Sequence, residues 1–290
     1  MSQSLNPNPI YDVIILGASG FTGKYVIREA LKFLDVPSSP LKNLAIAGRN
    51  TSKFSQALQW PSRPNPPPEI PILTADTTDP SSLRDLASQT KIILNSCADS
   101  GCDYLDISGE PEFMERIDMK YHDKAVENGS LVVSACGFDS IPAELGLMFN
   151  SIQWLPPAVP NSVEAYLSLE SDKRIVKNLG TYESAVLGAA NMDKLQELQR
   201  SRPKRPRPVI PGPPPPKGPL MNHLKEVGVW AVKLPSADAI VVRRALSCLA
   251  ENPHGLPGVN ESAEQVERRE AFWSSIKPAH FGVKIASKSL

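Results

Sequence analysis

Gly17-Ala18-Ser19-Gly20-Phe21-Thr22-Gly23 is the stretch of sequence that decides the fold. It follows the apolar run Val13-Ile14-Ile15-Leu16 and precedes a helical pattern from Tyr25 to Leu34, which predicts a strand, a glycine-rich turn and a helix. Glycines there let the backbone approach a pyrophosphate, which binds the free N–H groups of the helix N-terminus. The alternative is a tight turn without a ligand. We predict a dinucleotide site with these turn residues: Gly17, Ser19, Gly20, Phe21, Thr22 and Gly23.

Strands and helices alternate through the first half of the chain, which predicts a Rossmann-like, doubly wound, mostly parallel sheet. We assign residues 1–150 to an NAD(P)-binding domain and residues 151–290 to a smaller, incomplete α+β domain for substrate binding or dimerisation. The predicted strands are Tyr11–Leu16, Asn43–Ala47, Ile70–Thr74, Lys91–Asn95, Asp103–Ile107 and Leu131–Ala135, followed in the second domain by Ser162–Glu170 and Val227–Val232. The predicted helices are Phe21–Leu34, Ser52–Gln59, Ser81–Ser88, Pro111–Asn128, Ile141–Asn150 and Thr181–Gln199.

The second domain contains a proline-rich loop, residues 201–219. Nine of the seventeen residues from Pro203 to Pro219 are proline, so the loop can form polyproline II or stay disordered but cannot form core. Five basic residues between Arg200 and Arg207 precede most of these prolines. A nuclear signal, an SH3 ligand and a patch for acidic lipids are open alternatives, and a solvated surface loop is the favoured interpretation.

Bulk composition excludes several functions. The formal net charge of the 290 residues is zero, which gives no sign of nucleic-acid binding. The four cysteines form no Cys-x-x-Cys pair and the four histidines are scattered, so we expect no metal site. No apolar stretch is long enough to span a membrane. The first nine residues lack the apolar core of a signal peptide, so the sequence by itself predicts a cytoplasmic protein.

The cofactor preference is indicated by the residue after the second strand, Ala47-Gly48-Arg49. NAD-selective sites place an acid there for the ribose 2′-hydroxyl, whereas an arginine holds the 2′-phosphate of NADP. Arg49 therefore favours NADP (NADPH), against the alternative of a surface arginine at a helix start. Asp76, just past the third strand, is a candidate contact to the adenine or a simple turn residue.

Two polar clusters follow strands, where ligands bind in this architecture. One is Asp106-Ile107-Ser108-Gly109-Glu110, and the other is Gly137-Phe138-Asp139-Ser140-Ile141-Pro142. Asp106, Glu110 and Asp139 are therefore candidates for acid–base catalysis or substrate positioning. For each carboxylate a structural role is the favoured alternative, because acids also cap helices and bind loop amides.

Together these motifs resemble the saccharopine dehydrogenase-like oxidoreductases, a family related to saccharopine reductases and mycobacterial trans-acting enoyl reductases. The resemblance implies an NADP-binding domain followed by a substrate domain, NADPH-linked reduction of a small-molecule or lipid-like substrate, and a link to lipid metabolism, mitochondria and lipid droplets. A homodimer and peripheral membrane contact are further expectations. The segments that carry the resemblance are Gly17–Gly23, Ala47–Arg49, Tyr104–Pro111, Gly137–Pro142 and Gly180–Ala185.

The chain departs from the family pattern after Asn95, where only Ser96–Cys102 precede the next strand. Parallel strands usually need a crossover of about a dozen residues, so we expect a shortened isoform that lacks one crossover helix and leaves apolar surface exposed. A catalytically impaired NADP-binding isoform, acting as a sensor or partner-binding module, is thus the alternative to an active oxidoreductase. An extended short-chain reductase or epimerase ranks last, because no tyrosine is followed by a lysine four residues later.

Overall fold

The computed structural model describes residues 9–59, 69–94, 102–138, 140–172, 179–233, 236–258 and 260–288. The chain forms two compact units. The first unit comprises Met1–Ser108 and Glu112–Cys136, and the second unit comprises Gly109–Pro111 and Gly137–Leu290. The division at Gly137 differs from the domain limit at residue 150 that the sequence suggested, and the helix that begins at Ser140 belongs to the second unit.

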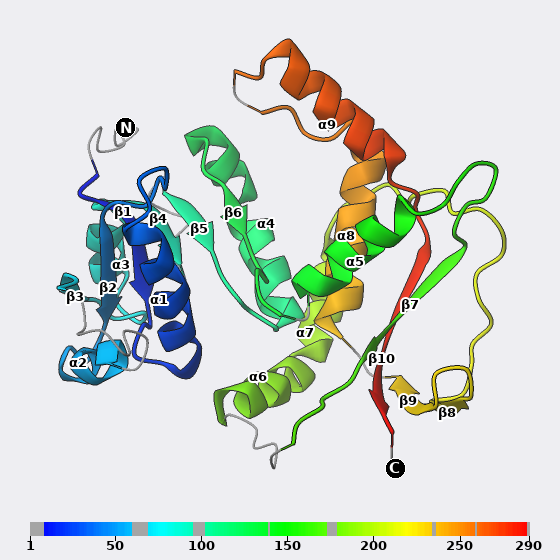
Figure 1. Cartoon of the computed structure of the whole chain (residues 1–290), viewed down its shortest axis with the longest axis horizontal. Helices are drawn as coiled ribbons and strands as arrows, with labels where there is room; N and C mark the ends of the chain where they lie inside the picture. Colours follow the sequence, from blue (N-terminus) through cyan, green and yellow to red (C-terminus); the bar gives the residue numbers. More distant parts are fainter. Residues whose placement is uncertain are drawn as a thin grey trace. The chain divides into compact units, whose positions relative to one another are not determined.

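The first unit is built on a six-stranded sheet with the order β3-β2-β1-β4-β5-β6, in which every pairing is parallel (Figure 1). This is the strand order of dinucleotide-binding Rossmann sheets, so the predicted fold class is confirmed. The strands are β1 (Tyr11–Leu16), β2 (Leu44–Gly48), β3 (Ile72–Thr74), β4 (Thr90–Leu94), β5 (Asp103–Leu105) and β6 (Val132–Val133). The helices are α1 (Phe21–Leu34), α2 (Ser52–Gln59), α3 (Pro80–Ala87) and α4 (Pro111–Asn128).

Strand β1 is covered on both faces of the sheet. Successive side chains of a strand point to opposite faces, so neighbouring residues report on the two faces separately. Ile14 packs in a cluster with Leu86 of α3. Ile15 packs in a second cluster with Ile27 of α1 and Phe54 of α2. Helices therefore cover this part of the sheet on both faces and fix the carboxyl end of β1.

The connection between β4 and β5 is unusually short, since only eight residues separate Leu94 from Asp103. The strands nevertheless pair in parallel, with Leu94 opposite Leu105. Because β5 is only three residues long, the connection from the end of β4 has to run back along the sheet by only the length of that short strand. Residues 95–101 lie outside the described residues. On one face of this part of the sheet, Ile93, Cys102 and Tyr104 are buried, with 0%, 4% and 2% exposure. On the opposite face Ile92 and Leu105 are only partly buried, so exposed apolar surface on that face stays a prediction.

The second unit is built on a four-stranded mixed sheet with the order β7-β10-β9-β8. Helices α5 and α8 share an apolar cluster with Ala279, and Val163 of β7 and Phe281 of β10 pack against it. Residues 202–220 of the proline-rich region form neither helix nor strand. The strands are β7 (Ser162–Leu167), β8 (Met221–Leu224), β9 (Val229–Lys233) and β10 (His280–Ser287), and the helices are α5 (Ser140–Ser151), α6 (Leu179–Ala190), α7 (Met192–Ser201), α8 (Ala237–Glu251) and α9 (Ala263–Ser275).

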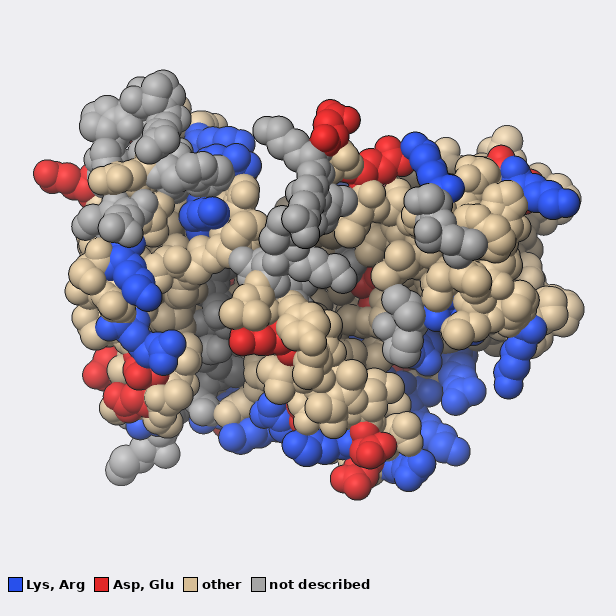
Figure 2. Space-filling model, turned by 90° about the horizontal axis from the view of Figure 1, so that it is seen from below, with Lys and Arg blue, Asp and Glu red and all other residues tan. Residues whose placement is uncertain are grey.

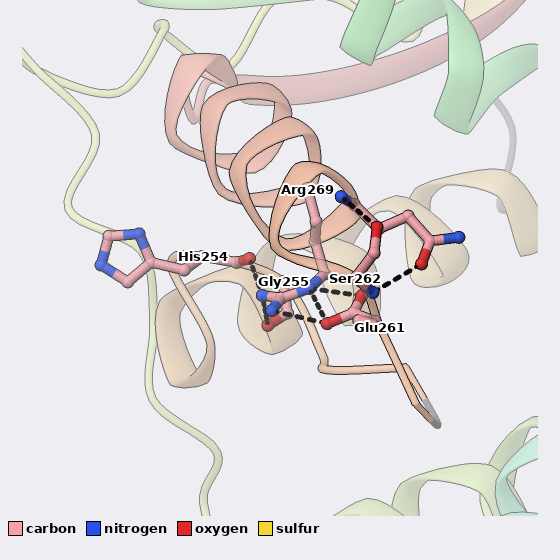
Figure 3. A network of polar contacts seen from close by, with 6 residues as sticks. His254, Gly255, Glu261, Ser262 and Arg269 are labelled. Atoms are coloured by element: carbon pink, nitrogen blue, oxygen red, sulfur yellow. Dashed lines mark hydrogen bonds and ion pairs between the residues drawn. The ribbon is translucent and has the colours of Figure 1, made fainter.

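Arg269 of α9 holds the loop between α8 and α9 in place (Figure 3). Its Nε and Nη2 atoms donate to the two carboxylate oxygens of Glu261, both at 2.9 Å, and Nη1 donates to the carbonyl oxygen of His254 at 2.7 Å. The bidentate pair lowers the pKa of Glu261, mainly through the hydrogen bonds from Arg269. Gly255 completes the loop with a φ of 74°, and a β-carbon there would lie 2.1 Å from the Trp273 ring.

Candidate functional site

The glycine-rich turn joins β1 to α1 as the sequence predicts. Gly17 has a φ of 79°, a left-handed conformation that favours glycine. Its N–H donates to the carbonyl oxygen of Ala47 in β2, and its own carbonyl oxygen accepts from the N–H of Gly20, both at 2.9 Å. These bonds tie the turn to the carboxyl ends of β1 and β2.

The other two glycines allow a close approach of backbone to backbone. A β-carbon on Gly20 would lie 3.1 Å from the carbonyl oxygen of Gly17, and one on Gly23 would lie 2.6 Å from the carbonyl oxygens of both Gly17 and Ala18. Gly20 caps α1 without a side-chain hydrogen bond. Because Ser19, Gly20, Phe21 and Thr22 are exposed, the helix N-terminus is accessible to an anion. The turn thus fits a pyrophosphate.

Arg49 follows β2 directly and is exposed. The strand ends of β2 and β3 lie side by side, since Gly48 pairs with Thr74 and accepts a hydrogen bond from the N–H of Ala75. A β-carbon on Gly48 would lie 2.9 Å from the ring of Phe54, so glycine lets α2 pack tightly against the strand end. The carboxyl ends of β1, β2 and β3 therefore present the glycine turn and Arg49 at one edge of the sheet.

Asp76 forms a local turn. Its Oδ1 atom accepts from the N–H of Thr78 at 2.9 Å and from the Thr78 hydroxyl at 2.8 Å. These hydrogen bonds lower the pKa of Asp76, and the positive charge of Arg49 contributes. The geometry supports the turn-residue interpretation, and a contact with adenine stays a prediction.

Asp106 is buried, with 6% exposure, at the end of β5. Its Oδ1 atom accepts from the N–H groups of Ser108 at 2.8 Å and Ala135 at 2.9 Å, while Oδ2 accepts from the Tyr104 hydroxyl at 2.7 Å. The bond to Ala135 supports a left-handed φ of 61° at that residue. The carboxylate therefore holds together the segments that follow β5 and β6, which is a structural role.

The second unit brings Glu110 together with Ser184 of α6, whose hydroxyl donates to Oε1 of Glu110. The two residues belong to separate motifs of the sequence, Tyr104–Pro111 and Gly180–Ala185. Ser184 was not among the predicted site residues, although its place in a motif was a usable signal. Asp139, the third carboxylate candidate, lies outside the described residues.

Comparisons with known proteins identify the family. A relative from Arabidopsis thaliana, named "Probable mitochondrial saccharopine dehydrogenase-like oxidoreductase", is 67% identical over 306 aligned positions, which cover 100% of this chain and 67% of the relative. The chain belongs to the saccharopine dehydrogenase-like oxidoreductases. A human saccharopine dehydrogenase-like oxidoreductase is 30% identical over 83% of this chain and 60% of its own length. A lipid droplet localized protein of Caenorhabditis elegans is 34% identical over 81% of this chain and 59% of its own length.

This member of the family spans only 59–67% of the length of these three relatives. No protein-family model matches the chain. A solved structure of apo saccharopine dehydrogenase (L-Glu forming) from Saccharomyces cerevisiae is similar at 16% identity and a TM-score of 0.42, over 55% of this chain and 34% of that chain. Within the described ranges, none of the helices combines the length and the apolar character that a membrane crossing requires.

Proposed function

We propose that this saccharopine dehydrogenase-like chain is an NADP-dependent oxidoreductase that acts on a small-molecule or lipid-like substrate. Family membership and the Rossmann strand order imply a nicotinamide cofactor, which would supply or accept the hydride. The N–H groups of the turn from Gly17 to Gly23 would hold the pyrophosphate. The observation that carries the NADP preference is Arg49, an exposed cation directly after β2, where NAD-selective sites place an acid.

Lys53 adds a second cation to the same helix start. The Oδ1 atom of Asn50 accepts from the N–H of Ser52 at 3.1 Å and from its hydroxyl at 2.6 Å, which fixes the first turn of α2. Lys53 is exposed and lies four residues after Arg49. We propose that Arg49 and Lys53 both contact the 2′-phosphate, Arg49 through its guanidinium and Lys53 as a point charge.

The cofactor preference is tested by calorimetry with NADPH and NADH. Arg49→Ala is expected to weaken NADPH binding about 10- to 150-fold, since a charge-assisted hydrogen bond contributes about 1.5–3 kcal/mol. NADH binding should stay the same, because NADH has no 2′-phosphate. Arg84→Ala, which removes an exposed arginine of α3 in the same unit, is the matched control. Unchanged NADPH affinity in Arg49→Ala would contradict the assignment.

A catalytically impaired NADP-binding isoform, acting as a sensor or partner-binding module, is the second candidate. It is favoured by the short connection between β4 and β5. The alignment with the plant relative is 16 positions longer than the 290 residues of this chain, so the relative carries residues that this chain lacks. The engagement of Asp106 by three protein donors also leaves it poorly suited to proton transfer.

Inserting a family-like segment after Asn95 separates the two candidates. An impaired isoform should gain NADPH affinity and a higher melting temperature when a missing wall is restored. If the natural and the extended chains bind NADPH equally, melt together and oxidise it at equal rates with a shared substrate, the chain is an ordinary active enzyme. An extended short-chain reductase or epimerase stays the least favoured function.

Location and assembly are further proposals. The name of the Caenorhabditis elegans relative supports contact with lipid droplets and a role in lipid metabolism, and the name of the plant relative supports a mitochondrial location. A homodimer is the expected assembly, which sedimentation velocity would test directly.

A further inference from the structure

Residues 211–220 of the second unit form a surface segment that the proposed enzymatic function does not use. The sequence is Pro211-Gly212-Pro213-Pro214-Pro215-Pro216-Lys217-Gly218-Pro219-Leu220, and all ten residues are exposed. In Figure 1 this stretch belongs to the long yellow trace that leads into β8. We call residues 211–220 the proline segment. Because all ten residues are exposed, the proline segment adds nothing to the core of the unit and is available to solvent or to a partner.

Steric rules fix the conformation of the four consecutive prolines, residues 213–216. The pyrrolidine ring locks φ near −65°, and a residue that precedes proline is forced to an extended ψ. Three of these four prolines precede another proline, so the steric rules predict a turn of polyproline II helix over residues 213–216, a conformation that has no internal hydrogen bonds. The turn is about 9 Å long at roughly 3.1 Å per residue.

Both ends of the proline segment are tied to the sheet of the second unit. The side-chain amide of Asn161 donates to the carbonyl oxygens of Pro211 at 2.7 Å and Pro213 at 3.0 Å. The backbone of Asn161 is itself bonded to β10, since its carbonyl oxygen accepts from the N–H of His280 at 2.9 Å. At the other end, the N–H of Lys233 in β9 donates to the carbonyl oxygen of Leu220 at 2.8 Å. The polyproline turn therefore lies in a segment that hydrogen bonds anchor at Pro211 and Pro213 on one side and at Leu220 on the other.

We propose that the proline segment is a docking ligand for a proline-recognition domain, one whose aromatic-lined groove has an acidic rim. Such grooves bind polyproline II helices because the ligand is already ordered and its pyrrolidine rings stack on aromatic side chains. The anchored ends reduce the ordering cost of binding further. Charge sets the character of the rim. The proline segment has no Asp or Glu and one cation, Lys217, and the ten residues before it add no acid and four cations, Arg202, Lys204, Arg205 and Arg207.

The same cations could attract a surface of acidic lipids, but the polyproline turn favours a protein partner. A lipid-binding segment combines cations with a broad apolar face. Within the described residues of this region, the exposed large apolar side chains are limited to Val209 and Leu220, with the uncharged prolines between them. The experiment therefore has to distinguish binding to a protein domain from binding to a lipid surface.

The test measures binding of the full chain to purified WW, SH3 and EVH1 domains by fluorescence polarisation. At least one domain should bind, and Pro214→Ala/Pro215→Ala should weaken its affinity tenfold or more. Pro206→Ala/Pro208→Ala is the matched control, because it removes two prolines upstream of the segment and should leave the affinity unchanged. Pro206, Pro214 and Pro215 are exposed and Pro208 is partly exposed, and equal melting temperatures verify that the fold is intact.

Two further variants test the anchoring and the rim. Asn161→Ala should weaken binding of the full chain severalfold, because it removes the hydrogen bonds that anchor one end of the proline segment. A synthetic peptide of residues 208–220, which has neither anchor, should also bind more weakly than the natural chain. Lys217→Ala should flatten the salt dependence of binding. Absence of binding to every domain, or equal loss in the control variant, overturns the proposal. Binding to phosphatidylserine vesicles that needs the cations and not Pro214 and Pro215 also overturns it, in favour of lipid.

Discussion

Glycine has different tasks in helix α1 of the first unit and in helix α5 of the second. In α1, a β-carbon on Gly23 would lie 2.6 Å from two backbone carbonyl oxygens of the turn. In α5, a β-carbon on Gly146 would have no neighbour within 4 Å. The backbone of the turn therefore excludes a side chain at position 23, whereas nothing around position 146 does. The constrained glycine lies in the turn to which we assign the proposed dinucleotide.

Alanine at the two positions is the strongest way to break this comparison. Gly23→Ala is expected to destabilise the first unit by about 1–3 kcal/mol, because a backbone carbonyl has to move. Gly146→Ala should instead stabilise by about 0.5–1 kcal/mol, because alanine is the better residue inside a helix. Urea unfolding followed by circular dichroism measures both. A stability of Gly23→Ala equal to or above that of the natural chain would show that the turn can relax.

Two carboxylates, Asp106 of the first unit and Glu110 of the second, extend the comparison. Asp106→Ala leaves two backbone N–H groups and the Tyr104 hydroxyl without their acceptor, at a cost of about 1.5–3 kcal/mol. Ser184→Ala in the second unit removes one hydroxyl from Glu110 and should cost about 1 kcal/mol. Thermal melting of the two variants gives the ranking. If Asp106→Ala melts at the natural temperature, its carboxylate is free for catalysis and its structural assignment is wrong.

Much of the first unit could be predicted because its signals are local. Strand β1 and helices α1, α2 and α4 have the predicted bounds. The start of α3 is equally local, since the side chain of Asp79 accepts from the N–H of Ser81 and Pro80 occupies the first turn. Periodicity, glycine spacing and capping all act within about ten residues, so one sequence contains them in full.

The second unit was harder to predict because its order comes from distant partners. Strand β10 pairs with β7 although their first residues, His280 and Ser162, are far apart in the chain, and β8, β10, α8 and α9 were not predicted. The predicted helix from Thr181 to Gln199 is two helices, with Asn191 between them. The role of Asp106 was open for the same reason, since one of its donors, Ala135, comes from the next strand end.

Two aspartates extend the comparison of the units to pH. In the first unit, Asp12 accepts from the ammonium group of Lys91 at 2.7 Å and from the N–H groups of Lys42 and Asn43, both at 2.9 Å. The hydrogen bond from Lys91 is the main cause of its lowered pKa. In the second unit, Asp238 is 4% exposed and its Oδ1 atom has no hydrogen-bond partner among the described residues. Burial raises the pKa of Asp238.

The opposite shifts predict opposite pH dependence, measured as the difference in melting temperature between each Asp→Asn variant and the natural chain. The stabilisation by Asp12 is complete above the ordinary aspartate pKa of about 4 and disappears as the pH falls through its lowered pKa. Asp12→Asn should therefore lose at most about 1 kcal/mol at neutral pH, because Lys91 is largely exposed, and nothing in strong acid. The cost of Asp238 is absent in strong acid and grows as the pH rises from about 4 to its raised pKa. Relative to the natural chain, Asp238→Asn should thus be more stable at neutral pH than in acid. If the difference in melting temperature from the natural chain changed with pH in the same direction for both variants, the opposite pKa shifts of Asp12 and Asp238 would be wrong.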